Sequence, residues 1–79
     1  MMITIRYFGS LKETIGRSTE TLSISELESL TVLDVWHYVN GDFPLAENIL
    51  TALNMDYVTR SHRVNDGDEV AFFPPVTGG

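Results

Sequence analysis

The sequence predicts an α+β fold in which a mixed sheet of about four strands packs on one main helix and shorter helices. Two observations carry this prediction: residues 2–8 alternate as a half-buried strand does, and residues 31–40 carry an apolar stripe at helical spacing. The chain has 79 residues and no cysteine, so packing alone must hold one small domain together.

The N-terminal third predicts two strands around a short helix. Residues 2–8 place apolar side chains at every second position. Ser10 stands three residues before Glu13, the spacing of a capping box, and Gly16 supplies a helix stop. Residues 19–24 alternate again and predict a second strand.

The middle of the chain predicts the main helix. Thr31 and Asp34 have capping-box spacing at its start. Pro44 suits the first turn of another short helix within residues 42–50. The apolar side chains of the main helix recur at i, i+3, i+4 and i+7, which is one helix face: Val32, Val35, Trp36 and Val39.

The C-terminal third predicts two more strands. Residues 51–58 predict a strand, although their alternation is impure. Asp66-Gly67 predicts a hairpin turn before the last strand, residues 69–73. Pro74-Pro75 ends that strand, because proline has no amide hydrogen for a sheet ladder.

This order of elements predicts a β-grasp, or ubiquitin-like, architecture, because one sheet and one helix bury each other's apolar faces. We expect the β-grasp domain to span residues 1–73 and residues 74–79 to form an extended, flexible tail. The second face of the sheet then looks outward and carries an exposed apolar patch. Phe72 and Phe73 alternate in direction, so we expect one of them to face a partner.

Charge and composition argue against several function classes. The net charge is −6, and the five basic residues are scattered, so no basic stripe is available for nucleic acid. No apolar run approaches the roughly 20 residues that span a bilayer. The first residues alternate and do not resemble a signal peptide. We therefore expect a cytoplasmic protein without a nucleic-acid or membrane partner.

No group of residues resembles a catalytic or metal site. His37 and His62 have no further ligands beside them, so we expect surface or capping roles. The acidic run at residues 66–69 lacks the ligand spacing of a calcium loop. We expect the chain to bind no metal and no cofactor, and not to be a catalyst on its own.

The tail has the composition of an arm that enters another protein. Pro74-Pro75 and the stiff Val76 and Thr77 favour extension, and the two final glycines fit a channel too narrow for any other residue. The carboxylate of Gly79 is unreactive until it is activated, most simply by adenylation with ATP on a separate enzyme. Because the chain has no cysteine, any sulfur that it carries sits on the terminal carbonyl as a thiocarboxylate.

The chain resembles the MoaD family, the small subunits of molybdopterin synthase, from end to end. The ending DGDEVAFFPPVTGG, residues 66–79, is the most specific match. ITIRYFGSLKETIG, residues 3–16, is similar to the first strand and short helix of that family, and LNMDYV, residues 53–58, to its third strand. Thr77 stands where serine is common.

The resemblance implies a sulfur carrier for molybdenum cofactor biosynthesis. An E1-like, ATP-using adenylyltransferase would adenylate Gly79, and a sulfurtransferase system would convert it to a thiocarboxylate (1-thioglycine). Gly78 would let the tail enter both partners. Sulfur would reach cyclic pyranopterin monophosphate in a heterotetramer of two small and two large subunits. The arm that lies in the large subunit would consist of Phe73, Pro74, Pro75, Val76 and Thr77.

Three alternatives remain open from the sequence. A sulfur carrier for thiamine thiazole shares the Gly-Gly end, although the Pro-Pro pair argues against it. A ubiquitin-like protein modifier would transfer Gly79 to a substrate lysine, and Lys12, the only lysine, makes chain building improbable. A pure docking module would survive removal of Gly79, whereas every acyl-transfer role would be lost.

Overall fold

The computed structural model describes residues 1–25 and 29–75. A five-stranded sheet has the strand order β2-β1-β7-β4-β5, and β3 pairs with β6 beside it. In chain order the elements are β1 (Met2–Tyr7), α1 (Ser10–Ile15), β2 (Thr19–Ser23), β3 (Leu30–Thr31), α2 (Val32–Asn40), β4 (Leu50–Leu53), β5 (Asp56–Tyr57), β6 (Arg63–Val64) and β7 (Glu69–Phe73).

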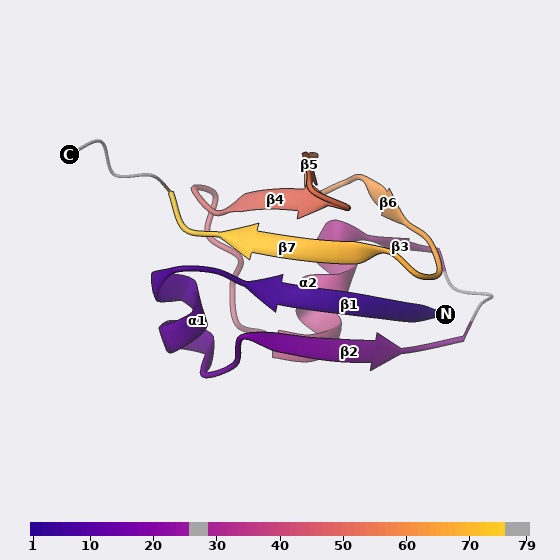
Figure 1. The fold of residues 1–79 in the computed structure, drawn as a ribbon, viewed down its shortest axis with the longest axis horizontal. Coiled ribbons are helices and arrows are strands. Elements are labelled where there is room, and N and C mark those ends of the chain that lie inside the picture. The colour runs from indigo at the N-terminus through magenta and orange to yellow at the C-terminus, as the bar shows by residue number, and fades with distance from the viewer. Residues whose placement is uncertain (26–28, 76–79) are drawn as a thin grey trace.

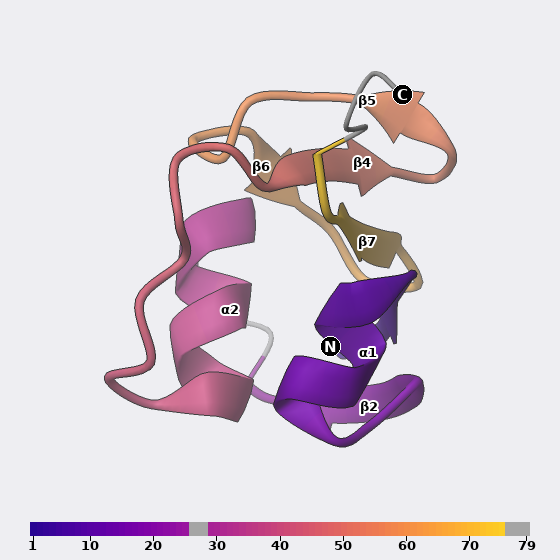
Figure 2. The ribbon, with the colours of Figure 1, turned by 90° about the vertical axis from the view of Figure 1, so that its left-hand side faces the viewer.

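The sheet is mixed, as predicted, because β1 and β7 run parallel while the other pairs are antiparallel. Figure 1 looks onto the sheet with α2 behind it, and Figure 2 shows the same sheet edge-on with α2 covering one face. This is the predicted β-grasp architecture. Within the described residues, neither helix has the length and apolar character needed to cross a membrane.

The core lies between α2 and the covered face of the sheet. Trp36 of α2 is only 1% exposed, and its ring meets that of Phe72 edge to face with the centroids 4.9 Å apart. The indole Nε1 of Trp36 donates a hydrogen bond to the carbonyl oxygen of Phe43 (2.7 Å), so its polar atom is satisfied. The alternating residues of β1 complete this core: Ile3, Ile5 and Tyr7.

Helix ends follow the sequence in part. The capping box at the start of α2 is confirmed, since Thr31 Oγ1 accepts from the Asp34 amide and Asp34 Oδ2 accepts from the Thr31 amide. The predicted Ser10 capping box is wrong. Ser10 is the first helical residue of α1, and Gly9 occupies the cap position without a side-chain cap. Gly16 ends α1 in a left-handed conformation, as predicted.

Residues 42–50 do not form the predicted short helix. Leu45 is buried at the core edge, and the preceding Pro44 belongs to irregular chain. The Arg60 guanidinium donates hydrogen bonds to the carbonyl oxygens of Leu45 and Ala46, both at 2.9 Å. This side chain from a distant loop supplies donors that a helical turn would otherwise provide, so the carbonyl oxygens of this irregular segment are satisfied without a helix.

Two predictions for the C-terminal third are also wrong in detail. Residues 51–58 form a hairpin of β4 and β5, because Asn54 and Met55 adopt positive φ values of 50° and 73°, as the central residues of a type I′ turn do. The turn at Asp66-Gly67 exists, but it joins β6 to β7, which lie in different sheets and do not pair as a hairpin.

A polar network joins β1, β2 and α2 at one end of the core. The buried Tyr7 hydroxyl donates to Glu20 Oε2 (2.7 Å) and accepts from Asn40 Nδ2 (3.1 Å). Arg17 Nε donates to the same Glu20 oxygen at 2.9 Å. Burial, followed by the hydrogen bond to Glu20, raises the pKa of Tyr7 above its ordinary value.

Replacing Tyr7 by phenylalanine tests this network. We expect Tyr7→Phe to lower the free energy of unfolding by about 1–2 kcal/mol at neutral pH, because buried hydrogen bonds are lost. The folded chain holds the Tyr7 proton more tightly than the unfolded chain does. The wild type should therefore lose stability as the pH rises above the ordinary tyrosine pKa of about 10. Urea unfolding against pH should show a smaller alkaline loss in Tyr7→Phe; an equal loss would contradict the raised pKa.

Candidate functional site

The face of the sheet opposite α2 carries an apolar groove. Its floor consists of two small residues, Ala52 of β4 and Ala71 of β7, which are register partners. Large side chains rise around that floor and leave a shallow space of about 180 Å³. We call this feature the outer groove, and its four large lining residues are Phe8, Met55, Tyr57 and Phe73.

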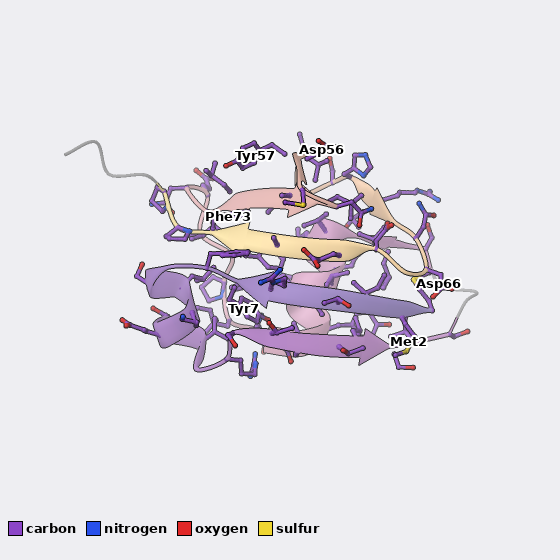
Figure 3. The ribbon with its side chains drawn as sticks, viewed as in Figure 1. Met2, Tyr7, Asp56, Tyr57, Asp66 and Phe73 are labelled. Atoms are coloured by element: carbon purple, nitrogen blue, oxygen red, sulfur yellow. The ribbon has the colours of Figure 1, made fainter. Side chains whose placement is uncertain are left out.

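Strand alternation places these side chains outward. Phe8 continues the outward positions of β1, and Phe73 holds the last outward position of β7. Their rings stack with centroids 4.5 Å apart and planes 8° from parallel. Tyr57 meets Phe73 edge to face at 6.1 Å, and Figure 3 shows both residues toward the end of the sheet where the tail leaves.

Two of the large apolar side chains of the groove are mostly exposed to solvent. Tyr57 is 72% exposed and Met55 is 90% exposed. Single exposed apolar residues are ordinary, but a cluster of aromatic side chains and methionine on one open face is typical of a protein-binding surface. The exposed apolar patch predicted from the sequence is thereby confirmed.

One charged pair borders the groove. The Arg6 guanidinium lies over the Phe8 ring, 5.2 Å from its centroid, and 3.9 Å from a Glu69 carboxylate oxygen. Both side chains are partly exposed, so this long ion pair contributes little to stability. Its effect is to place a cation and an anion at the rim of an otherwise apolar surface.

The tail begins beside the outer groove. Phe73 is half-buried, Pro74 is half-buried and Pro75 is exposed. The Phe8 amide donates to the Phe72 carbonyl oxygen at 3.1 Å. This bond extends the β1–β7 pairing almost to the end of β7, where the tail begins. Figure 1 shows the chain leaving β7 at the end of the molecule that carries α1. The other tail residues predicted to bind partners lie outside the described residues: Val76, Thr77, Gly78 and Gly79.

The predicted alternation of Phe72 and Phe73 is confirmed. Phe72 is fully buried against Trp36, whereas Phe73 faces the outer groove. The capping role expected for a histidine is confirmed at His37, whose Nδ1 donates to the Gly41 carbonyl oxygen (2.7 Å) at the end of α2. Over residues 1–25 and 29–75, no three His, Asp or Glu side chains gather as a metal site.

The sequence interpretation named only Phe73 of the four large side chains of the groove and missed the other three. Phe8 could have been found, because the alternation of residues 2–8 already places its side chain on the other face of the strand from Ile3 and Ile5. Tyr57 and Met55 could not, since their outward placement depends on the hairpin at residues 54–55.

Comparison with known proteins places the chain in a family. Residues 5–79 match the model of the ThiS family. The chain belongs to the ThiS family. It is also 36% identical to a molybdopterin synthase sulfur carrier subunit of Escherichia coli, over 99% of this chain and 100% of that protein. A protein of the same name in Haemophilus influenzae is 31% identical over 99% of this chain and its whole length.

Solved structures show the same fold for this ThiS-family chain. SAMP1 from Haloferax volcanii matches with a TM-score of 0.76 and 25% identity over the whole of both chains. A complex of subunits 1 and 2 of the molybdopterin-converting factor from Helicobacter pylori contains a chain that matches with a TM-score of 0.65 and 23% identity, also over both whole chains. The ubiquitin-like fold and the resemblance to sulfur carrier subunits, both predicted from the sequence, are confirmed.

Two neighbouring phenylalanines should respond differently to substitution. Phe72→Ala should lower the free energy of unfolding by about 3–5 kcal/mol, because it opens a cavity beneath Trp36. Phe73→Ala should cost roughly 1 kcal/mol, since its ring is only half-buried. Urea unfolding of both variants measures the difference, and similar losses would contradict the assignment of one ring to the core and the other to the groove.

Proposed function

We propose that this chain is a sulfur carrier of molybdenum cofactor biosynthesis whose reactive atom is the Gly79 carbonyl carbon. The observation that carries the proposal is the outer groove at the root of a Pro-Pro…Gly-Gly tail, on a domain whose described residues gather no metal-ligand cluster. The relatives named as sulfur carrier subunits, matched along their whole lengths, support it.

Activation proceeds on an E1-like adenylyltransferase. A Gly79 carboxylate oxygen attacks the α-phosphorus of ATP and pyrophosphate leaves, which gives an acyl adenylate. Sulfide attacks the carbonyl carbon; a sulfurtransferase persulfide yields that sulfide when a second thiol reduces it and a disulfide forms. The bond to AMP then breaks and a C–S bond replaces it, leaving a thiocarboxylate. ATP is a substrate of the activating enzyme and is not held by this chain.

The outer groove provides the docking surface for the large synthase subunit. Its aromatic cluster offers an anchor that a partner can desolvate, and the Arg6–Glu69 pair at the rim adds orientation and little energy. Because Phe73 belongs to both the groove and the root of the tail, a partner that covers the groove also receives the tail. Two such carriers on a dimer of large subunits make the proposed heterotetramer.

Sulfur transfer then takes place in the large subunit. The thiocarboxylate sulfur attacks a carbon of cyclic pyranopterin monophosphate and displaces an oxygen substituent from it, which joins Gly79 to the pterin as a thioester. Water then cleaves the acyl C–S bond, so the sulfur stays on the pterin and Gly79 returns to its carboxylate. The acids, bases and substrate pocket of this step belong to the partner, so the carrier needs only to present sulfur. The expectation that this chain is not a catalyst by itself follows from the same division of roles.

Two other functions share the activation step. A thiazole-forming sulfur carrier is favoured by the family match. A protein modifier is the second alternative, because SAMP1 stands for small archaeal modifier protein 1, and its product would be an isopeptide bond between Gly79 and a lysine. The fate of the activated Gly79 distinguishes them.

Thiol labelling tests the proposed activation. The chain is incubated with an E1-like enzyme, ATP and sulfide, and then with a thiol-selective alkylating reagent. Label should appear on Gly79 only, because the unmodified chain has no cysteine. Peptide mapping is required, since exchange of oxygen for sulfur has nearly the mass of oxidising one of the three methionines. A chain lacking Gly79 is the control. No label from a competent enzyme would contradict sulfur transfer.

Substitution in the groove tests docking. Tyr57→Ser should weaken binding to the large subunit by about tenfold or more, because exposed aromatic anchors carry much of the energy of an interface. Tyr38→Ser is the matched control, since Tyr38 is 49% exposed on α2, on the opposite side of the sheet. Calorimetric titration measures both. Equal effects of the two substitutions would contradict docking through the outer groove.

A further inference from the structure

A close contact at the tail root has no part in the proposed chemistry so far. A side chain at Gly9, built as a Cβ atom, would lie 2.9 Å from Pro74 Cγ and 3.4 Å from Pro74 Cδ. The first of these distances is shorter than real Cβ contacts allow. Pro74 therefore lies directly against the bare backbone of Gly9, in the turn between β1 and α1.

The backbone of Gly9 is suited to this turn. Its φ of 58° and ψ of −142° lie in a region that is almost restricted to glycine. The Gly9 carbonyl oxygen accepts from the Lys12 amide at 3.2 Å, so the same residue that contacts Pro74 also begins α1. The position of Gly9 is thus fixed by the strand on one side and by the helix on the other.

Three contacts hold the start of the tail to the end of β1. The Phe8 amide binds the Phe72 carbonyl, the Phe8 ring stacks on the Phe73 ring, and Gly9 receives the Pro74 ring. Proline has its own φ fixed near about −65°, so a proline ring held in place also fixes the direction of the chain that follows.

We infer that Gly9 is a positioning residue for the tail. Its missing side chain lets Pro74 lie in the β1–α1 turn, and this contact sets the direction in which the chain leaves the domain at Pro74 and Pro75. The inference rests on the proposed function. The direction of the tail matters only if Gly79 must enter an active site of the partner enzyme while the domain is bound to another part of that enzyme.

The inference predicts a specific kinetic signature. Gly9→Ala moves the Pro74 ring but leaves the exposed outer-groove side chains Tyr57 and Met55 unchanged. Binding of the domain to the E1-like enzyme, which dominates KM, should be preserved because the exposed side chains are unchanged, whereas a reacting carboxylate displaced by about 1 Å loses one to two orders of magnitude in rate. We expect kcat for pyrophosphate release by the E1-like enzyme to fall about tenfold or more, with KM changed less than about twofold.

Gly41 provides a matched control. Its φ of 58° and ψ of −131° nearly equal those of Gly9, so alanine meets the same backbone strain there. A Cβ atom at Gly41 would meet nothing within 4 Å, and Gly41 caps the end of α2 instead of contacting the tail. Gly41→Ala should therefore destabilise the domain to a similar degree and leave kcat at the wild-type value.

The experiment measures pyrophosphate release for the wild type, Gly9→Ala and Gly41→Ala at a temperature where circular dichroism shows all three folded. A fall in kcat confined to Gly9→Ala supports the inference. Equal kcat in the two glycine variants, or a loss that appears in KM alone, overturns it. A wild type that is not adenylated at all overturns the proposed function instead, so the two failures are distinguishable.

A second variant keeps the test decisive if Gly9→Ala does not fold. Pro74→Ala removes the ring from the same contact without straining Gly9, and should also lower kcat at nearly constant KM. Where Gly9→Ala does fold, adding it to Pro74→Ala should lower kcat little further, because the contact is already absent. Fully independent, multiplicative effects of the two substitutions would overturn the inference.

Discussion

The parallel pairing of β1 with β7 is the constraint on which the rest of the structure depends. It joins the first strand of the chain to the last, from Thr4 opposite Glu69 to Tyr7 opposite Phe72. Parallel neighbours need a long crossover connection, and here everything between the two strands serves as that connection. The pairing puts the last strand in the middle of the sheet, so the tail starts from the most firmly held part of the domain.

The same pairing explains why one surface can serve both docking and delivery. Alternation along β1 and β7 sends Phe72 into the core and Phe73 outward beside Phe8. Because Phe72 is anchored in the core, the position of the neighbouring Phe73 ring in the groove is fixed. The groove in turn adjoins the first tail residue. Hydrophobic packing supplies the rigidity, while the exposed ion pair at Arg6 contributes little energy.

The sequence correctly predicted those elements whose structure is set by nearby residues. The alternation of residues 2–8, the stripe of α2 and the Thr31 cap are each set by neighbours a few residues away. The two main errors have different causes. Near Leu45 the chain bonds to the distant Arg60 side chain and not to a helical turn, whereas the turn at Asn54 is local but contains no glycine or proline to mark it. The contact of Gly9 with Pro74 joins residues from opposite ends of the chain, so no local pattern could predict it.

The most direct test of this account follows the sulfur itself. The carrier is loaded at Gly79 with radioactive sulfur and mixed with the large synthase subunit and cyclic pyranopterin monophosphate. We expect the label to move to the pterin product and the carrier to return to its carboxylate form, and we expect both changes to require the pterin. Label that stays on Gly79, or a carrier that becomes joined to lysine instead, would contradict it.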